Sequence, residues 1–122
     1  MADELTLNTG WTYNKNGRKR VISPTVSQED ISGAGVVENM QAIGFAAHEA
    51  LVLGDVATPG FCYFRNSHAT NYIEIGIDST GTFVPFIKLM AGQSCFVWWG
   101  GTDPYAKANT SAINLDYAIA DR

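Results

Sequence analysis

Hydrophobic and polar residues alternate along most of the chain, which is the period of a β-strand with one buried face. Residues 71–79, NYIEIGIDS, show the pattern clearly, because Ile73, Ile75 and Ile77 share one side. Residues 113–119, INLDYAI, repeat it with isoleucine, leucine and tyrosine on one side. The pattern predicts a half-buried strand in each segment.

Turn-forming residues separate the alternating segments. NKNG at 14–17 and DSTG at 78–81 each lie between two strand-like runs, so each predicts a hairpin. A further loop is predicted at 53–60, which contains two glycines and a proline. Pro24 and Pro85 have no backbone N–H, so their strands are predicted to lie at a sheet edge or to be irregular there.

Residues 38–51, ENMQAIGFAAHEAL, are compatible with a helix or a strand. Met40 and Ile43 have helical spacing, but Gly44 in the middle costs about 1 kcal/mol relative to alanine. Residues 39–45 also read as a strand, and the rest of the chain favours that reading. We therefore predict a strand here.

About eight to ten short strands, with little or no helix, result from this reading. Strands at this spacing are typical of an antiparallel sandwich or barrel. We predict an all-β fold, an antiparallel β-sandwich resembling a jelly roll. The length of 122 residues suits one core, so residues 1–122 are predicted to form a single domain.

The formal net charge of -4 argues against general nucleic-acid binding, which requires several cations aimed at phosphates. One stretch differs: residues 14–20, NKNGRKR, contain half of the eight basic residues, among them Arg18, Lys19 and Arg20. A solvated turn is the first interpretation, contact with an acidic neighbouring protein the second, and contact with DNA the weakest. The first ten residues do not resemble a signal peptide, and no apolar run has membrane-spanning length, so no membrane partner is expected.

Few side chains could carry out catalysis. His48 is next to Glu49, and neighbours on a strand point to opposite faces, so the two are not expected to act as an acid–base pair. His68 lies in a predicted turn. Glu74 and Asp116 would form a carboxylate pair only if their strands adjoin. We predict no catalytic residues and no enzyme activity.

No metal or cofactor is predicted either. Two histidines and the dispersed Cys62 and Cys95 do not have the spacing of a zinc site, and DSTGT at 78–82 lacks the oxygen ligands of a calcium loop. The two cysteines are expected to be buried thiols. A disulfide between them would require that their strands be neighbours.

Aromatic residues offer a binding surface. Trp98 and Trp99 are consecutive, so on a regular strand one faces inward and the other outward. The outward tryptophan, near Tyr105, would stack on a sugar or anchor a protein interface. In a third interpretation, a loop of the same chain covers this tryptophan. The candidate interface residues are Trp98, Trp99, Tyr105, Arg18, Lys19 and Arg20.

Four motifs in the later part of the chain occur as a set. They are TPG at 58–60, N-x-x-x-T-N-[YF]-[IV]-E-I-G at 66–76, G-T-F-x-P-F-x-x-L-x-x-G at 81–92 and Y-A-K-A-N-T-x-A-x-x-L-x-Y at 105–117. From about Asn39 onward the chain resembles small structural proteins of tailed-phage virions. CFVWWGG at 95–101 departs from the more aliphatic strand of the family, so partner-contacting residues cannot be carried over simply.

This resemblance implies a β-sandwich component of a phage particle, located in the virion and assembled in the cytoplasm of the bacterial host. We expect a capsid decoration (cement) protein that binds the major capsid protein or a neighbouring virion protein and stabilises the shell. We also expect a homo-oligomer, with a trimer as the working guess. The alternative is a tail or baseplate component that contacts a receptor or carbohydrate.

Overall fold

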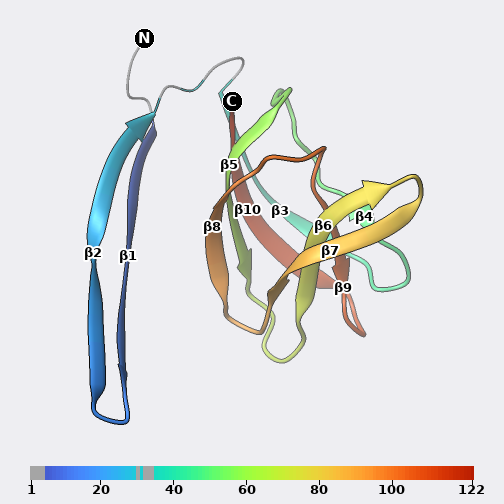
Figure 1. Cartoon of the computed structure of the whole chain (residues 1–122). Helices are drawn as coiled ribbons and strands as arrows, with labels where there is room; N and C mark the ends of the chain where they lie inside the picture. Colours follow the sequence, from blue (N-terminus) through green and yellow to red (C-terminus); the bar gives the residue numbers. More distant parts are fainter. Residues whose placement is uncertain (1–4, 30, 32–34) are drawn as a thin grey trace. The chain divides into compact units, whose positions relative to one another are not determined.

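The computed structural model describes residues 5–29, 31 and 35–122 (Figure 1). Over these residues the chain contains β-strands and no helix, and every strand pairing is antiparallel, which confirms the all-β prediction. Contacts divide the chain into two units, Met1–Ile31 and Ser32–Arg122, which we describe separately. The prediction of a single domain over residues 1–122 stays a prediction.

The first unit is a two-stranded antiparallel hairpin, which we call the ribbon. It consists of β1 (Leu5–Lys15) and β2 (Arg18–Glu29). Asn16 and Gly17 form its turn with φ angles of 52° and 79°. Two successive residues with positive φ match the right-handed twist of the flanking strands, so the predicted hairpin is confirmed.

A register break lies in the middle of the ribbon. Thr9 is paired with Thr25, but Trp11 is paired with Ile22, so β2 has one more residue than β1 in this interval. Pro24 falls within the interval and lacks the donor that a regular ladder would use. The irregularity predicted at this proline is therefore confirmed.

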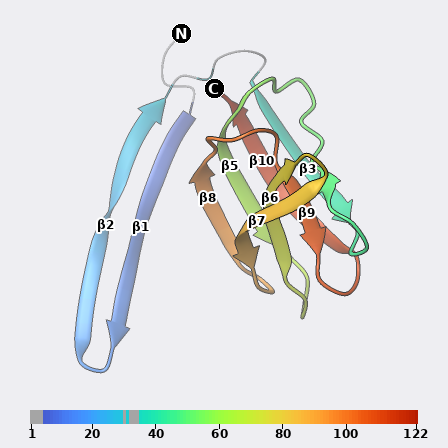
Figure 2. The ribbon, with the colours of Figure 1, turned by 45° about the vertical axis from the view of Figure 1, so that its right-hand side comes forward.

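The second unit contains two four-stranded sheets (Figures 1 and 2). The first sheet has the order β3 (Val36–Ile43), β10 (Ile113–Asp121), β5 (Pro59–Asn66) and β8 (Ser94–Trp98). The second sheet has the order β4 (Glu49–Ala50), β9 (Tyr105–Ala108), β6 (Ile73–Ser79) and β7 (Thr82–Leu89). Residues 38–51 thus contribute β3 and β4, which confirms the strand prediction for the first part of that segment.

The core contains the inward-facing residues of both sheets, as expected of a sandwich-like arrangement. Ile73 and Ile75 on β6 are fully buried, and so are Leu115 and Ile119 on β10. The alternation predicted for these two strands is therefore confirmed. Among the residues that the structure describes, the other large, fully buried apolar side chains are Trp99, Tyr117, Phe64, Ile43, Ile113, Pro104 and Cys62.

The β6–β7 hairpin combines a tight turn with a register break. Thr80 and Gly81 form the turn with φ angles of 49° and 91°, as predicted for DSTG. The break follows Ile75, where Gly76 is paired with Pro85. A Cβ atom on Gly76 would lie 2.0 Å from the carbonyl oxygen of Val84, so the two backbones approach too closely for any other residue. Strand β7 is also the end strand of its sheet, which confirms the prediction for Pro85.

Candidate functional site

Four aromatic side chains lie together on the outer side of β5 and β8, and we call them the aromatic face: Phe61, Tyr63, Phe96 and Trp98. The register pairs Phe61 with Trp98 and Tyr63 with Phe96. Ring centroids are 5.0 Å apart for Phe61 and Trp98, 5.9 Å for Phe61 and Phe96, and 5.1 Å for Tyr63 and Phe96. The rings thus form one continuous cluster across the two strands.

The two rings of the aromatic face on β8 are exposed, and the two on β5, Phe61 and Tyr63, are half-buried. Phe96 is 59% exposed and Trp98 is 47% exposed. On the inner sides, Cys62 and Phe64 of β5 are fully buried, and Cys95 and Val97 of β8 are half-buried against the core. Residues 61–64 of β5 and 95–98 of β8 are therefore apolar on both sides, whereas a strand with one solvated side normally places polar residues there, as β5 does only at the exposed Arg65. An exposed apolar patch of this kind is typical of an interaction surface.

Arg122 lies at one end of the aromatic face. Its guanidinium carbon is 5.4 Å from the centroid of the Trp98 ring, and its Nη1 donates a hydrogen bond to the carbonyl of Trp99. The cation–π contact holds the exposed indole in one place. A fixed aromatic ring loses little side-chain entropy when a partner binds.

Strand β8 carries half of the aromatic face and is the end strand of the first sheet. Its sequence, SCFVW, contains neither a charged residue nor proline. By contrast, the end strand β7 contains Pro85 and Lys88, which discourage another chain from pairing with it. The edge at β8 has no such protection, so a strand of a protein partner could pair with it.

The ribbon carries a second uncovered apolar surface, which we call the apolar stripe: Trp11, Tyr13 and Ile22. These residues share one side of the ribbon, since Trp11 is paired with Ile22 and Tyr13 follows two residues after Trp11. Trp11 is 61% exposed, and Tyr13 and Ile22 are exposed as well.

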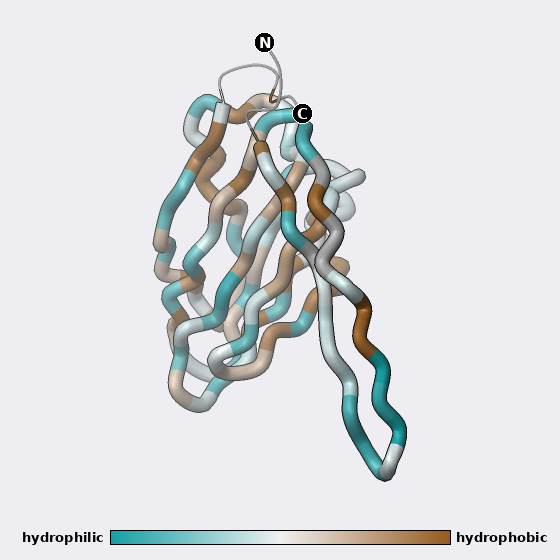
Figure 3. The backbone as a smooth tube through the Cα atoms, turned by 90° about the vertical axis from the view of Figure 1, so that its left-hand side faces the viewer, coloured by the Kyte–Doolittle hydropathy of each residue, from teal (hydrophilic) through white to brown (hydrophobic). Residues whose placement is uncertain are grey.

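The stripe is followed, toward the turn, by the ribbon tip: Lys15, Arg18, Lys19 and Arg20. All four residues are exposed. Figure 3 shows this change along the ribbon, with hydrophobic stretches on the strands and a hydrophilic turn. The predicted candidates Arg18, Lys19 and Arg20 thus lie together at the tip.

Charge is distributed unevenly between the two units. Residues 1–31 contain four basic and four acidic residues, and all four basic ones form the ribbon tip. Residues 32–122 contain four basic and eight acidic residues, so that unit carries the whole net charge of -4. A basic tip and an acidic sandwich therefore belong to the same chain.

Trp99 faces the opposite side from Trp98, as predicted for consecutive residues. It is 2% exposed, its ring packs 6.0 Å from that of Phe64 and 5.2 Å from that of Phe86, and its indole N–H donates to the carbonyl of Thr102. A side chain enclosed in this way belongs to the core and cannot touch a partner. Of the tryptophan pair, only Trp98 is retained as a candidate contact.

Tyr105 lies on β9 in the second sheet, not beside Trp98 in the first. With Asp78, Thr102 and Asp103 it lines a shallow hollow of about 410 Å³. The candidates predicted from sequence thus separate into the ribbon tip, the outer side of the first sheet and the outer side of the second.

A histidine–carboxylate pair that sequence did not predict lies beside this hollow. Nε2 of His48 is 2.6 Å from Oδ1 of Asp78, and the His48 ring stacks on Phe83 at 5.3 Å. The hydrogen bond with His48, and then one from the Gly81 amide, lower the pKa of Asp78 below its ordinary value. The pair joins the β6–β7 turn to the segment before β4. No signal in the sequence relates these residues, which are 30 positions apart.

Glu49 does not join this pair, in agreement with the expectation for neighbouring residues. Its carboxylate accepts a hydrogen bond from the Gly44 amide. His68 caps a turn, as Nδ1 accepts hydrogen bonds from the amides of Thr70 and Asn71. The histidines therefore have structural partners.

The suggested carboxylate pair does not form. Glu74 lies on β6 and Asp116 on β10, and these strands belong to different sheets. Glu74 is instead paired across the sheet with Lys88 and Lys107, so each neighbour brings the opposite charge.

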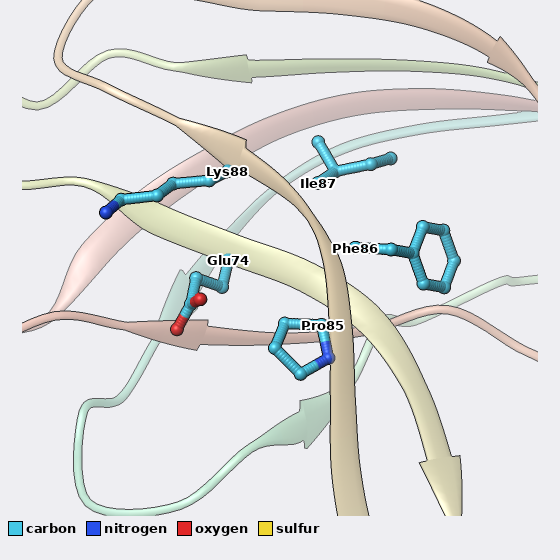
Figure 4. A pocket seen from close by; sticks show the side chains of 5 residues that line it. All are labelled: Glu74, Pro85, Phe86, Ile87 and Lys88. Carbon is cyan, nitrogen blue, oxygen red and sulfur yellow. The ribbon is translucent and has the colours of Figure 1, made fainter.

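A second hollow, of about 240 Å³, lies along β6 and β7 and is lined by Glu74, Pro85, Phe86, Ile87 and Lys88. Figure 4 shows Glu74 and Lys88 on one side of the hollow and Phe86 directed away from them. Lys88 Nζ is 4.1 Å from the centroid of the Tyr72 ring. Lys88 thus contacts an aromatic ring of its own unit, and Glu74 is its register partner on β6.

Cys62 and Cys95 are free thiols on the neighbouring strands β5 and β8. They are not opposite each other, because Cys62 is paired with Val97 and Cys95 with Phe64. Burial, and then the nearby Cys95, raise the pKa of Cys62 to about 12, and burial raises that of Cys95 too. At neutral pH both are protonated and behave as small hydrophobic side chains.

Over the residues that the structure describes, no group of three or more histidine, cysteine, aspartate or glutamate side chains is placed to hold a metal ion. The same residues include no helix long and apolar enough to cross a membrane.

Comparison with known proteins gives no relative: no family model matches the chain, and neither a curated protein nor a solved structure does. A proposal for function must therefore rest on the surfaces and motifs described above.

Proposed function

We propose that the chain is a structural component of a bacteriophage virion, a capsid decoration (cement) protein that acts by binding protein neighbours. The observation that carries the proposal is the aromatic face, which lies uncovered beside an unprotected edge strand. A few residues contribute most of the binding energy at a protein interface, and tryptophan and tyrosine are over-represented among them. The phage setting comes from the resemblance of residues 39–122 to small virion proteins.

Binding energy alone is enough for such a function. A protein that binds only the assembled shell stabilises that shell by mass action, without any chemical step. The chain supplies apolar anchors at the aromatic face and a charged contact at the ribbon tip. The partner is the major capsid protein or a neighbouring virion protein, and the decoration protein itself is a homo-oligomer.

The motifs behind the resemblance build the fold. Asn66, the first residue of the second motif, is fully buried, and its side chain bonds the carbonyls of Asn71 and Leu89 and the amide of His68. Gly76, the last residue of that motif, permits the close approach to β7. The aromatic face includes Phe96 and Trp98, at the place where the sequence departs from the family. This division supports a shared scaffold with a partner surface particular to this chain.

The proposal includes no catalysis. His48, one of two histidines, is stacked on Phe83 and bonded to Asp78, where it fastens a turn. Both cysteines are protonated at neutral pH because burial raises the pKa of each thiol. His48 and the two cysteines therefore stabilise the fold.

Purified protein added to phage heads that lack it tests the proposal. We expect saturable binding to mature or expanded heads and a higher melting temperature of the decorated heads. Proheads before expansion serve as the matched control for state-specific binding. Recovery of the protein only in tail fractions, with no binding to heads, would refute the decoration role.

A tail or baseplate role with carbohydrate contact is the second candidate, and the exposure of Trp98 favours it. Sugars stack on exposed indole rings, although Arg122 already lies against this one. Binding to a glycan array that is lost in Trp98→Ala, and kept in the exposed control Phe86→Ala, would support this role. An array without signal would exclude its sugar-binding form.

A further inference from the structure

Two backbone hydrogen bonds show which residues of β8 face its neighbour β5. The amide of Trp99 donates to the carbonyl of Gly60 at 2.6 Å, and the amide of Asn66 donates to the carbonyl of Gln93 at 2.9 Å. Both bonds continue the register of β5 and β8, one residue beyond each end of β8. Along an antiparallel ladder, hydrogen-bonded pairs alternate with pairs that are not hydrogen-bonded. The odd-numbered residues of β8 therefore bond to β5, and the even-numbered residues do not.

The even-numbered residues of β8 direct their main-chain groups to the open side of the sheet. These residues are Ser94, Phe96 and Trp98, and β8 is the end strand, so no described strand of the sheet lies on that side (Figure 2). Their N–H and C=O groups recur every two residues, which is the pattern that an added strand would use. Phe96 and Trp98 also carry the two exposed rings of the aromatic face. A strand added here would therefore lie directly beside both rings.

The charged side chains nearest to β8 in the first sheet are positive. Arg65 on β5 is exposed and lies opposite the first residue of β8. Arg122 lies against Trp98 at the last residue of β8, with its guanidinium carbon 5.4 Å from the ring centroid. The carboxylates lie further away, since Asp116 faces Arg65 from β10 and Glu38 belongs to β3, one strand beyond. An added strand would thus meet one cation near each of its ends.

Neither β8 nor the ribbon of a second copy supplies the matching charge. Two β8 strands paired about a two-fold axis would place the Arg65 end of one copy beside the Arg122 end of the other, so like charges would meet at both ends. Residues 5–28 of the ribbon contain four basic residues and no acidic residue. Complementary charge therefore favours a segment of a different protein.

We propose that an extended segment of the neighbouring virion protein binds as an added strand along β8. Its main chain pairs with that of Ser94, Phe96 and Trp98, and its apolar side chains pack beside the two rings. An acidic residue near each end of the segment faces Arg65 or Arg122. Main-chain pairing supplies affinity in this mode, and the side chains at alternate positions supply specificity. The inference deepens the proposed function, on which it rests, by naming the chemistry of the partner segment.

A proline at position 96 tests the main-chain pairing. Phe96→Ala removes the ring alone, whereas Phe96→Pro removes the ring and also the outward N–H that the added strand would use. Both purified variants are titrated onto phage heads that lack the protein. Phe96→Ala should bind at least about thirtyfold more weakly than wild type, because it loses a central aromatic anchor. Phe96→Pro should bind at least about tenfold more weakly than Phe96→Ala, and equal binding of the two variants would contradict the pairing.

A proline on the opposite end strand of the same sheet is the matched control. The amide of Asp121 donates to the carbonyl of Gly35, so by the same alternation Ala42 on β3 directs its N–H away from β10. Ala42 is exposed, and Ala42→Pro should bind heads like wild type. Circular dichroism should show the same strand content for Phe96→Ala, Phe96→Pro and Ala42→Pro, which separates loss of contact from loss of fold.

Amide hydrogen exchange tests the added strand without any substitution. In the free chain, the amides of Phe96 and Trp98 should exchange faster than those of Cys95 and Val97, because only the latter two bond to β5. Exchange is then carried out on decorated heads, and the amides are measured by NMR after release of the protein. The Phe96 and Trp98 amides should exchange at least about tenfold more slowly on heads than in the free chain. Unchanged rates on heads would overturn the added strand.

The flanking cations give a test of the partner's charge. The double variant Arg65→Gln, Arg122→Gln should bind heads more weakly than wild type at low salt, and the difference should shrink as salt is added. Equal binding of the double variant and wild type at low salt would contradict the acidic residues assigned to the segment.

Failure of the inference can be distinguished from failure of the proposed function. Wild-type protein that does not bind heads would refute the decoration role and, with it, this partner. Wild-type protein that binds heads without slower exchange at Phe96 and Trp98 would refute the added strand alone. Sedimentation velocity tests the remaining occupant, because Phe96→Pro should leave the oligomeric state of the free chain unchanged. An oligomer that dissociates in Phe96→Pro would show that β8 pairs with a second copy and would overturn the inference.

Discussion

The ribbon and the sandwich follow the same alternating pattern but differ in burial. On β6, the alternating Ile73 and Ile75 are fully buried, whereas on one side of β1 Leu7 is 7% exposed and Trp11 is 61% exposed. Alternation determines which residues share a side of a strand. Whether that side is buried depends on a second layer, which the sandwich supplies for itself within residues 32–122.

Local turn chemistry does not explain the difference. Both hairpins turn through two residues with positive φ, Asn16–Gly17 and Thr80–Gly81. Both also contain a register break near a proline, Pro24 in one and Pro85 in the other. The two hairpins therefore have similar turns and register breaks, and they differ in burial because only the β6–β7 hairpin packs against other strands of the sandwich.

The largest effect should come from removing a core side chain. Phe64 is fully buried and packs on Trp99, so Phe64→Ala should lower the free energy of unfolding by about 3–5 kcal/mol. Trp11→Ala removes a larger side chain from the ribbon, yet it should change the unfolding of the monomeric sandwich by less than about 0.5 kcal/mol. Urea denaturation at low protein concentration measures both variants. Similar losses would show that the ribbon and the sandwich share one core.

A methyl group at the β6–β7 register break should have the next largest effect. Gly76→Ala would bring Cβ to 2.0 Å from the carbonyl oxygen of Val84, so the strands must separate locally. The expected cost is about 1–3 kcal/mol or more, and thermal unfolding measures it. Gly100→Ala is the matched control, because a Cβ there meets nothing within 4 Å and should have little effect. Equal stability of the two variants would contradict the close approach.

Asn66 tests how the loops at one end of the sandwich are held. Its buried amide donates to the carbonyls of Asn71 and Leu89 at 2.8 and 3.0 Å, so Asn66→Ala leaves two acceptors without this partner. We expect a loss of about 1–3 kcal/mol in unfolding free energy and faster amide hydrogen exchange in residues 67–71. Asn114→Ala, at an exposed position on β10, is the control. Unchanged exchange in the loop would show that Asn66 does not organise it.

Much of this fold could be predicted from the sequence because its signals are local. The turns at 14–17 and 78–81, the irregular strands at Pro24 and Pro85, and the alternation of β6 each depend on neighbouring residues. The order of strands in each sheet depends on pairings between distant residues, such as Tyr117 with both Asn39 and Phe64. No local pattern specifies these pairings.

The candidate site was predicted less completely, for a related reason. The sequence indicated that one of Trp98 and Trp99 faces outward, but the choice depends on which side of β8 meets the second sheet. It did not select Phe61, Tyr63 or Phe96, because an apolar strand is normally buried on both sides. The available signal was that FCYF and CFVW are both apolar on both sides, although only one side of each strand meets the core.

The smallest effect should come from pH, through the pair that joins the β6–β7 turn to the segment before β4. The pKa of Asp78 is lowered in the folded chain, first by the hydrogen bond with His48 and then by the Gly81 amide. The ionised carboxylate therefore stabilises the fold fully above the unfolded pKa of about 3.9, and this contribution is lost as the pH falls through the lowered folded value. Asp78→Asn should be less stable than wild type at neutral pH, and the difference should shrink toward about pH 2. Asp55→Asn, at an exposed loop position, is the control. A difference for Asp78→Asn that stays constant down to acid pH would mean that the ionised carboxylate does not fasten the turn, and that the sandwich holds this hairpin by its buried strands alone.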